Sequence, residues 1–140
     1  MSNPQKDKGS AAEREVQELL RRLLKLPHVR RALGAGRADD VGDIDGVPQA
    51  CIQVKWFASP LKAISEGINQ IDEQRKNRRV RFGAVFIRRT RVKQHPWIVV
   101  MEPENWCRMY EYAMRGVDLE REERAARVNA HGTRRPTRKR

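Results

Sequence analysis

The strongest structural signal in this 140-residue chain is the stretch Gln49-Ala50-Cys51-Ile52-Gln53-Val54-Lys55-Trp56-Phe57. Ser59-Pro60 follows shortly after it. Apolar and polar side chains alternate along the stretch with the period of two that is typical of a β-strand. One face carries Ile52, Val54 and Trp56. The other face carries Cys51, Gln53 and Lys55. Ser59 suits the N-cap of a helix and Pro60 its first position, so the pattern predicts a strand followed directly by a helix.

The neighbouring segments continue this alternation of helices and strands. The helix that follows Ser59 is predicted to reach about residue 78, with an apolar stripe formed by Leu61, Ile64, Ile68 and Ile71. Upstream, Ser10-Ala11-Ala12-Glu13 matches a capping box, which predicts a helix from Ser10 that ends before Pro27. Further strands are predicted around residues 29–33, 42–46, 82–87 and 97–101.

The resulting element order, αβββαββα, predicts an α/β fold with a small mixed β-sheet flanked by helices. Residues 9–116 are expected to form one domain, preceded by a flexible arm over residues 1–8. A last helix is expected to open at Glu102-Pro103 and to pack inward through Trp106, Met109, Tyr110 and Ala113. Residues 117–140 are expected to form a charged C-terminal extension, with a basic, disordered tail from about residue 129.

Charge is concentrated in two segments. The chain has a formal net charge of +12, but residues 74–94 hold nine Lys or Arg and residues 131–140 hold five more, and neither segment contains an acidic residue. The rest of the chain has 16 basic and 18 acidic residues. Clustered cations gain affinity for nucleic acid because they release phosphate counterions, so the pattern predicts a DNA- or RNA-binding protein.

Several other classes of protein do not fit the composition. No apolar stretch approaches the roughly 18–20 residues needed to span a bilayer, and the first seven residues contain no apolar secretory segment. We therefore expect a cytoplasmic protein with no membrane partner. Two cysteines and three unclustered histidines do not match the ligand spacing of a zinc site, and no glycine-rich phosphate loop indicates a nucleotide cofactor.

The strongest candidates for catalytic or metal-binding residues lie on two adjacent strands. Asp43 precedes the central strand, which carries Gln53 and Lys55 on one face. Oxygen ligands such as Asp43 and Gln53 suit Mg²⁺, and a lysine beside the ion can orient a water and offset charge on phosphorus. Glu13 lies at the rim of the apolar face of the first helix and is a further candidate ligand, although a capping-box glutamate also has a purely structural role. The same spacing also fits an ordinary strand with a polar outer face.

These residues together resemble the archaeal-type Holliday-junction resolvases, which are PD-(D/E)xK nucleases. The resemblance covers roughly residues 8–101. The matching segments are Lys8-Gly9-Ser10-Ala11-Ala12-Glu13-Arg14-Glu15, Arg30-Arg31, Asp43-Ile44 and Cys51-Ile52-Gln53-Val54-Lys55.

The resemblance implies a restriction-endonuclease-like core, a homodimer, and Mg²⁺-dependent paired nicking of four-way DNA junctions, with Mn²⁺ as a substitute ion. It implies that Glu13, Asp43 and Gln53 bind metal, and that Lys55 is the catalytic ammonium. Lys8, Arg14 and one of Arg30 or Arg31 would contact phosphates, and Ser59 would lie near the junction or the partner subunit. From the basic segment we add further DNA-contact candidates: Arg75, Arg78, Arg79, Arg88, Arg89 and Arg91.

One residue departs from the family pattern. Gln53 stands where the family has Glu, and an amide brings no negative charge to a metal site. Asp39, Asp40 and Asp45 are close enough in sequence to supply that charge, and Asp45 competes with Asp43 as the principal ligand. Two alternatives therefore stay open: another PD-(D/E)xK nuclease (flap, mismatch or sequence-specific), or a non-catalytic DNA-binding protein on a decayed nuclease fold.

Overall fold

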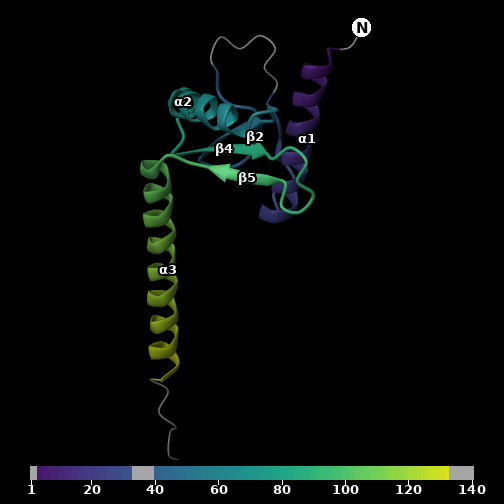
Figure 1. Ribbon diagram of the computed structural model, residues 1–140. Coiled ribbons are helices and arrows are strands. Elements are labelled where there is room, and N and C mark those ends of the chain that lie inside the picture. The colour runs from purple at the N-terminus through teal and green to yellow at the C-terminus, as the bar shows by residue number, and fades with distance from the viewer. Residues whose placement is uncertain (1–2, 33–39, 133–140) are drawn as a thin grey trace, which may run out of the picture. The chain divides into compact units, whose positions relative to one another are not determined.

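The computed structural model describes residues 3–32 and 40–132, with side chains described up to residue 130. Its elements are α1 (Pro4–Leu24), β1 (Arg30–Arg31), β2 (Ile44–Asp45), β3 (Ala50–Lys55), α2 (Pro60–Arg78), β4 (Phe82–Arg88), β5 (Trp97–Val100) and α3 (Pro103–Gly132) (Figure 1). The predicted element order and the mixed α/β class are confirmed. No helix in the described part of the chain combines the length and apolar character needed to cross a membrane.

The five strands form one mixed sheet in the order β1-β2-β3-β4-β5. Only the central pair, β3 and β4, is parallel, because α2 carries the chain from the end of β3 back to the start of β4. The other neighbouring strands are antiparallel. Ile44 of β2 pairs with Ile52 of β3, so the short β2 strand places Asp43 and Asp45 beside the polar face of β3.

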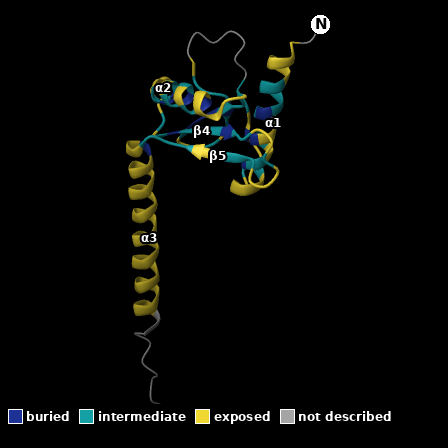
Figure 2. Cartoon of the chain, viewed as in Figure 1, coloured by how far each residue is buried: buried dark blue, intermediate teal, exposed yellow. Residues whose placement is uncertain are grey.

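Ile52 and Cys51 lie on opposite faces of β3, as predicted, and each face packs on its own buried cluster. Ile52 packs in one buried cluster with Val16 and Leu20 of α1, Val29 just before β1 and Ile44 of β2. Cys51, on the opposite face, packs with residues of α2 and β4 in the other: Ala63, Ile71, Val85 and Ile87. Buried positions lie where α1 and α2 meet the sheet (Figure 2). Burial raises the pKa of the Cys51 thiol to about 11, so Cys51 acts as a small core residue rather than a nucleophile.

Helix α1 begins six residues before the predicted start. Asn3 is its N-cap and accepts a hydrogen bond from Gln5 N at 3.1 Å, and Pro4 occupies the first turn. The prediction of a flexible arm is therefore wrong over residues 4–8, which are helical. Ser10 lies inside the helix and its Oγ accepts from Arg31 Nη2 at 3.2 Å, so the apparent capping box serves a tertiary contact instead.

Helix α2 has the predicted N-cap at Ser59, and its buried face includes the predicted Ile71 but not Leu61. Leu61 is 79% exposed, whereas the buried positions are Ala63, Gly67, Ile71 and Gln74. A Cβ at Gly67 would lie 2.6 Å from Val85 Cγ1. The helix therefore comes closest to β4 at Gly67, while Ile71 is fully buried in the same cluster and Ile64 and Ile68 pack against it.

We expect Gly67→Ala to destabilise the protein by about 1–2 kcal/mol, because overpacking against Val85 outweighs the higher helix propensity of alanine. The matched control is Gly9→Ala in α1, where an added Cβ would meet nothing within 4 Å. That control should be neutral or stabilising by up to about 1 kcal/mol. Urea unfolding of both variants measures the difference, and equal midpoints would show that α2 moves away from β4 without cost.

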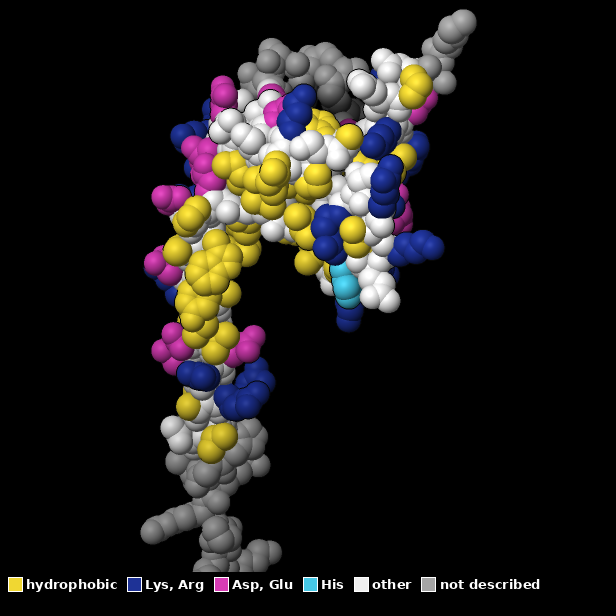
Figure 3. Space-filling model, viewed as in Figure 1, with side chains coloured by type: hydrophobic (Ala, Val, Ile, Leu, Met, Phe, Trp, Pro, Cys, Tyr) yellow, Lys and Arg dark blue, Asp and Glu magenta, His cyan; other side chains and the backbone are white. Residues whose placement is uncertain are grey.

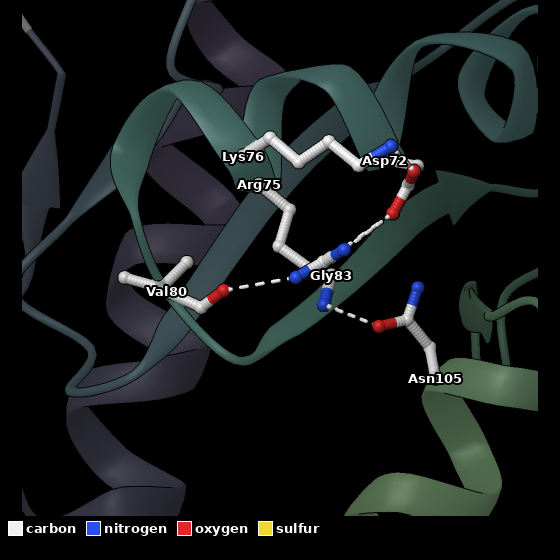
Figure 4. A network of polar contacts seen from close by, with 6 residues as sticks. All are labelled: Asp72, Arg75, Lys76, Val80, Gly83 and Asn105. Atoms are coloured by element: carbon white, nitrogen blue, oxygen red, sulfur yellow. Dashed lines mark hydrogen bonds and ion pairs between the residues drawn. The ribbon is translucent and has the colours of Figure 1, made fainter.

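The chain divides into two compact units, Met1–Asn105 and Trp106–Arg140. The first turn of α3 belongs to the first unit, where the buried Asn105 Oδ1 accepts from Gly83 N at 3.2 Å (Figure 4). Trp106, Met109, Tyr110 and Ala113, which we expected to pack inward, are exposed. The helix also continues past the predicted boundary at 116/117 and through residues 129–132, where the tail was expected to begin. Residues 133–140 of that tail lie outside the described residues.

Candidate active site

Asp43 is held beside β3 by two hydrogen bonds to the backbone of that strand, one from its own backbone N–H and one to its carboxylate. Its N–H donates to Ile52 O at 2.8 Å, and its Oδ2 accepts from Val54 N at 2.7 Å. Gly42 makes this approach possible, because its φ is +85° and a Cβ there would lie 2.8 Å from Ile52 O. The carboxylate is therefore fixed at the level of the Gln53-Val54-Lys55 step.

The environment of Asp43 favours its protonated form. Burial raises the pKa of Asp43 to about 6; the hydrogen bond from Val54 opposes this shift, the charge of Glu13 adds to it, and that of Lys55 opposes it. The electrostatic influence of Glu13 and Lys55 shows that three predicted site residues lie close enough to interact. A carboxylate that is costly to ionise in the folded protein is typical of a functional site.

Lys55 is held in a largely buried position. Its side chain is 14% exposed, and its Nζ lies 3.3 Å from the side-chain amides of Gln53 and Gln70 and 3.8 Å from Glu66 Oε1. The Gln53 side chain is buried, and two donors, Lys55 Nζ and Gln74 Nε2, face one end of its amide. Gln70 Oε1 also lies at that end and accepts from the Gln53 NH₂ at 2.8 Å in one amide orientation. In the other orientation the Gln53 oxygen accepts from Lys55 and Gln74, and its NH₂ donates to Gly67 O at 3.3 Å.

Helix α2 contributes a row of polar residues that we did not predict from the sequence. Glu66, Gln70 and Gln74 recur at every fourth position, so they share one face of the helix and meet the polar face of β3. Gln74 Nε2 donates to Asp40 Oδ2 at 2.6 Å, while the buried Gln74 Oε1 has no hydrogen-bond partner among the described residues. The i, i+4 spacing beside the apolar stripe was the signal available in the sequence.

Glu13 is engaged by an arginine rather than open to a metal. Its Oε2 accepts from Arg31 Nε at 2.7 Å, and the backbone N–H of Arg31 donates to Gln17 Oε1 at 3.0 Å. Arg31 therefore links β1 to α1 and neutralises Glu13. The role of Glu13 as a ligand and that of Arg31 as a phosphate contact stay predictions that would require this ion pair to open.

Asp45 is likewise bound within the fold. Arg78 Nη2 lies 2.5 Å from Asp45 Oδ1, and the same guanidinium donates to Val41 O and Ile44 O, both at 2.8 Å. Asp45 is therefore paired with an arginine inside the fold, whereas Asp43 is bound through Oδ2 to Val54 N. Asp40 is bound by Gln74, and Asp39 lies outside the described residues.

The basic segment does not form one uniform DNA-contact surface, because much of it binds within the fold. Arg78 is 13% exposed and clamps the Asp45 loop. Arg75 binds Asp72 at 2.7 Å and donates to Val80 O at 3.2 Å, and the adjacent Lys76 and Arg75 hold the pKa of Asp72 below its ordinary value (Figure 4). These guanidinium groups satisfy backbone carbonyls at the ends of elements.

Two further arginines at the end of β4 make internal contacts. Arg88 binds Glu15 at 3.0 Å and lies 4.6 Å from the centre of the Trp56 ring, over which Lys8 Nζ also lies at 4.7 Å. Arg89 donates to the carbonyls of Gln94 and His95. The exposed members of the predicted DNA-contact set are Arg14, Arg30, Arg79 and Arg91.

The donor set fits Mg²⁺ only as an ion that is bound together with a substrate phosphate. Among residues 3–32 and 40–132, no three His, Cys, Asp or Glu side chains form a metal-binding group. Mg²⁺ retains several waters and needs only one or two protein carboxylates when phosphates complete its shell. Asp43 meets that minimum, since Oδ2 is bound to Val54 N and no donor among the described residues engages its other oxygen. No protein-family model, curated protein or solved structure matches this chain.

Proposed function

We propose that the chain is a Mg²⁺-dependent endonuclease that hydrolyses phosphodiester bonds in branched DNA. The observation that carries the proposal is the position of the half-buried Asp43 carboxylate, bonded to Val54 N between Gln53 and Lys55. A desolvated carboxylate beside an immobilised ammonium matches the chemistry of phosphoryl hydrolysis better than the needs of a stable strand pair.

The element order and the mixed sheet support a restriction-endonuclease-like core of the kind that the resemblance to archaeal-type resolvases implies. Under this proposal the protein is a phage or bacterial relative of those enzymes. It would act as a homodimer, because two symmetric nicks require two sites.

The residues of the site have separate roles. Asp43 would hold the ion, with the Gln53 amide oxygen as a second ligand where Lys55 and Gln74 release it. Bound Mg²⁺ would polarise the phosphodiester and lower the pKa of a water. Lys55 would offset negative charge on the non-bridging oxygens while the water oxygen bonds to phosphorus and the P–O3′ bond breaks, leaving a 5′-phosphate.

Exposed arginines support DNA as the partner. Lys and Arg side chains gather over α1 in Figure 3, and Arg14 of that helix is exposed, as are Arg79 and Arg91 near the ends of α2 and β4. Contacts of this kind bind phosphates and read the shape of a duplex rather than its sequence.

The test is a nicking assay on four-way, three-way, flap and linear duplex DNA of matched sequence, with Mg²⁺, Mn²⁺ or EDTA. We expect paired nicks in the four-way junction that require a divalent ion. Preferential cutting of another substrate would make the chain a different PD-(D/E)xK nuclease, and no cutting of any substrate would overturn the enzymatic proposal.

The second candidate is a DNA-binding protein without catalysis, and the uncharged Gln53 is the observation that favours it. This candidate predicts salt-sensitive junction binding and no cleavage at any divalent-ion concentration.

Gln53→Glu separates these candidates. A glutamate would place a second carboxylate beside Asp43 and near Lys55 Nζ, so we expect the Mg²⁺ concentration for half-maximal cleavage to fall about tenfold, the equivalent of about 1.4 kcal/mol. The control Asn69→Asp adds a charge on the exposed face of α2 and should leave that concentration unchanged. If Gln53→Glu weakens the response to Mg²⁺, Gln53 does not face the metal position.

A further inference from the structure

Gln70 of α2 contacts both polar residues of β3 that the proposed site uses. Its Oε1 accepts a hydrogen bond from Lys55 Nζ at 3.3 Å. In one amide orientation of Gln53, the same oxygen also accepts from the Gln53 NH₂ at 2.8 Å. The Gln70 side chain is half-buried, so these contacts are made in the interior between α2 and the sheet. Gln70 therefore links the helix to both residues of the strand.

The packing of α2 fixes the position of Gln70. The next residue, Ile71, is fully buried against the sheet in the cluster that contains Val85. Gly67, three residues before Gln70, lies where an added Cβ would be 2.6 Å from Val85 Cγ1. Residues three apart lie on one side of a helix, so Gln70 belongs to the side of α2 that approaches the sheet most closely. The close approach allows an amide side chain to reach Lys55.

Lys55 has a neutral and an acidic neighbour on α2. Its Nζ lies within hydrogen-bond distance of Gln70 Oε1, but 3.8 Å from Glu66 Oε1, which is too far for a short hydrogen bond. Because the Lys55 side chain is largely buried, its ammonium depends on acceptors that the protein supplies. Without the Gln70 oxygen, the Glu66 carboxylate is the acceptor on α2 toward which the ammonium would move.

We propose that Gln70 is a positioning residue, which holds Lys55 beside Asp43 and away from Glu66. This role rests on the proposed function, in which the charge of Lys55 offsets negative charge on the phosphate oxygens. A neutral amide fixes the ammonium by accepting a hydrogen bond and leaves its positive charge available to the substrate. A carboxylate in close contact would neutralise that charge, as carboxylates elsewhere in this fold do for arginines.

Gln70→Met tests the role, because it keeps the length of the side chain and removes its acceptor. We expect the single-turnover cleavage rate at saturating Mg²⁺ to fall about 10- to 100-fold. The junction concentration for half-saturation should not change, because Lys55 acts on the transition state rather than on binding. Gln70→Glu should not retain the parent rate either, since a carboxylate there would neutralise Lys55. The matched control is Asn69→Met, at the adjacent exposed position of α2, which should cleave at the parent rate.

The double variant Gln70→Met/Glu66→Gln separates positioning from a general effect on folding. Removing the Glu66 carboxylate removes the group that competes for Lys55, so the double variant should recover most of the rate lost in Gln70→Met. A second substitution on the same helix would not repair a folding defect. Parent-like cleavage by Gln70→Met, or no recovery in the double variant, would overturn the positioning role.

Crystal structures of the parent and of Gln70→Met without DNA separate this inference from the proposed function. In the variant, Lys55 Nζ should lie within hydrogen-bond distance of Glu66. If Lys55 moves in this way and the parent cuts no DNA, the contact made by Gln70 is correct and the nuclease proposal fails. If the parent cuts DNA and Lys55 keeps its position in the variant, the nuclease proposal stands and the role of Gln70 is wrong.

Discussion

Asp43→Asn is expected to reduce cleavage of branched DNA by about 10³-fold or more, because it removes the carboxylate on which ion binding depends. The substitution is nearly isosteric, and the asparagine oxygen can still accept the hydrogen bond from Val54 N. Single-turnover nicking at saturating Mg²⁺ and saturating DNA measures the effect on chemistry separately from binding.

The same substitution should stabilise the protein. The pKa of Asp43 is raised from 3.8 to about 6, so the folded state binds more protons than the unfolded state between those values. Stability of the parent therefore falls as pH rises from about 4 to about 6, and the loss persists at pH 7. The asparagine side chain does not titrate, so thermal unfolding of Asp43→Asn in EDTA at pH 7 should show a gain of about 1–3 kcal/mol. A less stable Asp43→Asn variant would mean that the carboxylate has a structural role.

Asp45→Asn is the matched control, because it makes the same substitution at the other carboxylate of this loop. It weakens the ion pair with Arg78, so it should lower stability while cleavage stays within about tenfold of the parent. Loss of cleavage in Asp45→Asn with retained activity in Asp43→Asn would reverse the assignment of the two carboxylates.

Lys55→Ala is expected to slow cleavage by about 10²–10³-fold, the size of effect seen when one preorganised charge is removed from a transition state. Lys55 Nζ is fixed by the amides of Gln53 and Gln70, so its charge is already in place when the phosphate arrives. Lys55→Arg should not restore the rate, because a planar guanidinium cannot occupy the same position as an ammonium.

A second lysine near the same aromatic ring is the control for Lys55. Lys62 Nζ lies 5.9 Å from the centre of the Phe57 ring and Lys55 Nζ lies 5.6 Å from it, but Lys62 is exposed on α2. Lys62→Ala should therefore change junction affinity slightly and leave the single-turnover rate unchanged. Equal rate losses for the two variants would show that Lys55 contributes only general positive charge.

Local sequence signals predicted the fold where one residue type satisfies one local requirement. The alternation along β3 predicted a strand with Ile52 and Cys51 on opposite faces, and Ser59-Pro60 predicted the start of a helix. Both predictions were confirmed. The start of α1 was predicted wrongly because Ser10 and Asn3 both satisfy the requirements of an N-cap. In the predicted stripe of α2, Ile64, Ile68 and Ile71 do pack on the core, but Leu61 is exposed. Hydrophobicity favours Leu61, whereas close packing on Val85 favours Gly67.

The candidate site shows the same division. The amino-acid order alone establishes which chemical groups are present: a carboxylate at 43, an amide at 53, an ammonium at 55 and many arginines. Which of these groups are available to a ligand depends on the folded arrangement, which pairs Asp45 with Arg78 and Glu13 with Arg31 and brings the α2 polar row to Lys55. Ion pairs and burial depend on distances between segments that are far apart in the chain. A charged side chain therefore looks the same in sequence whether it faces solvent, a carbonyl or a substrate.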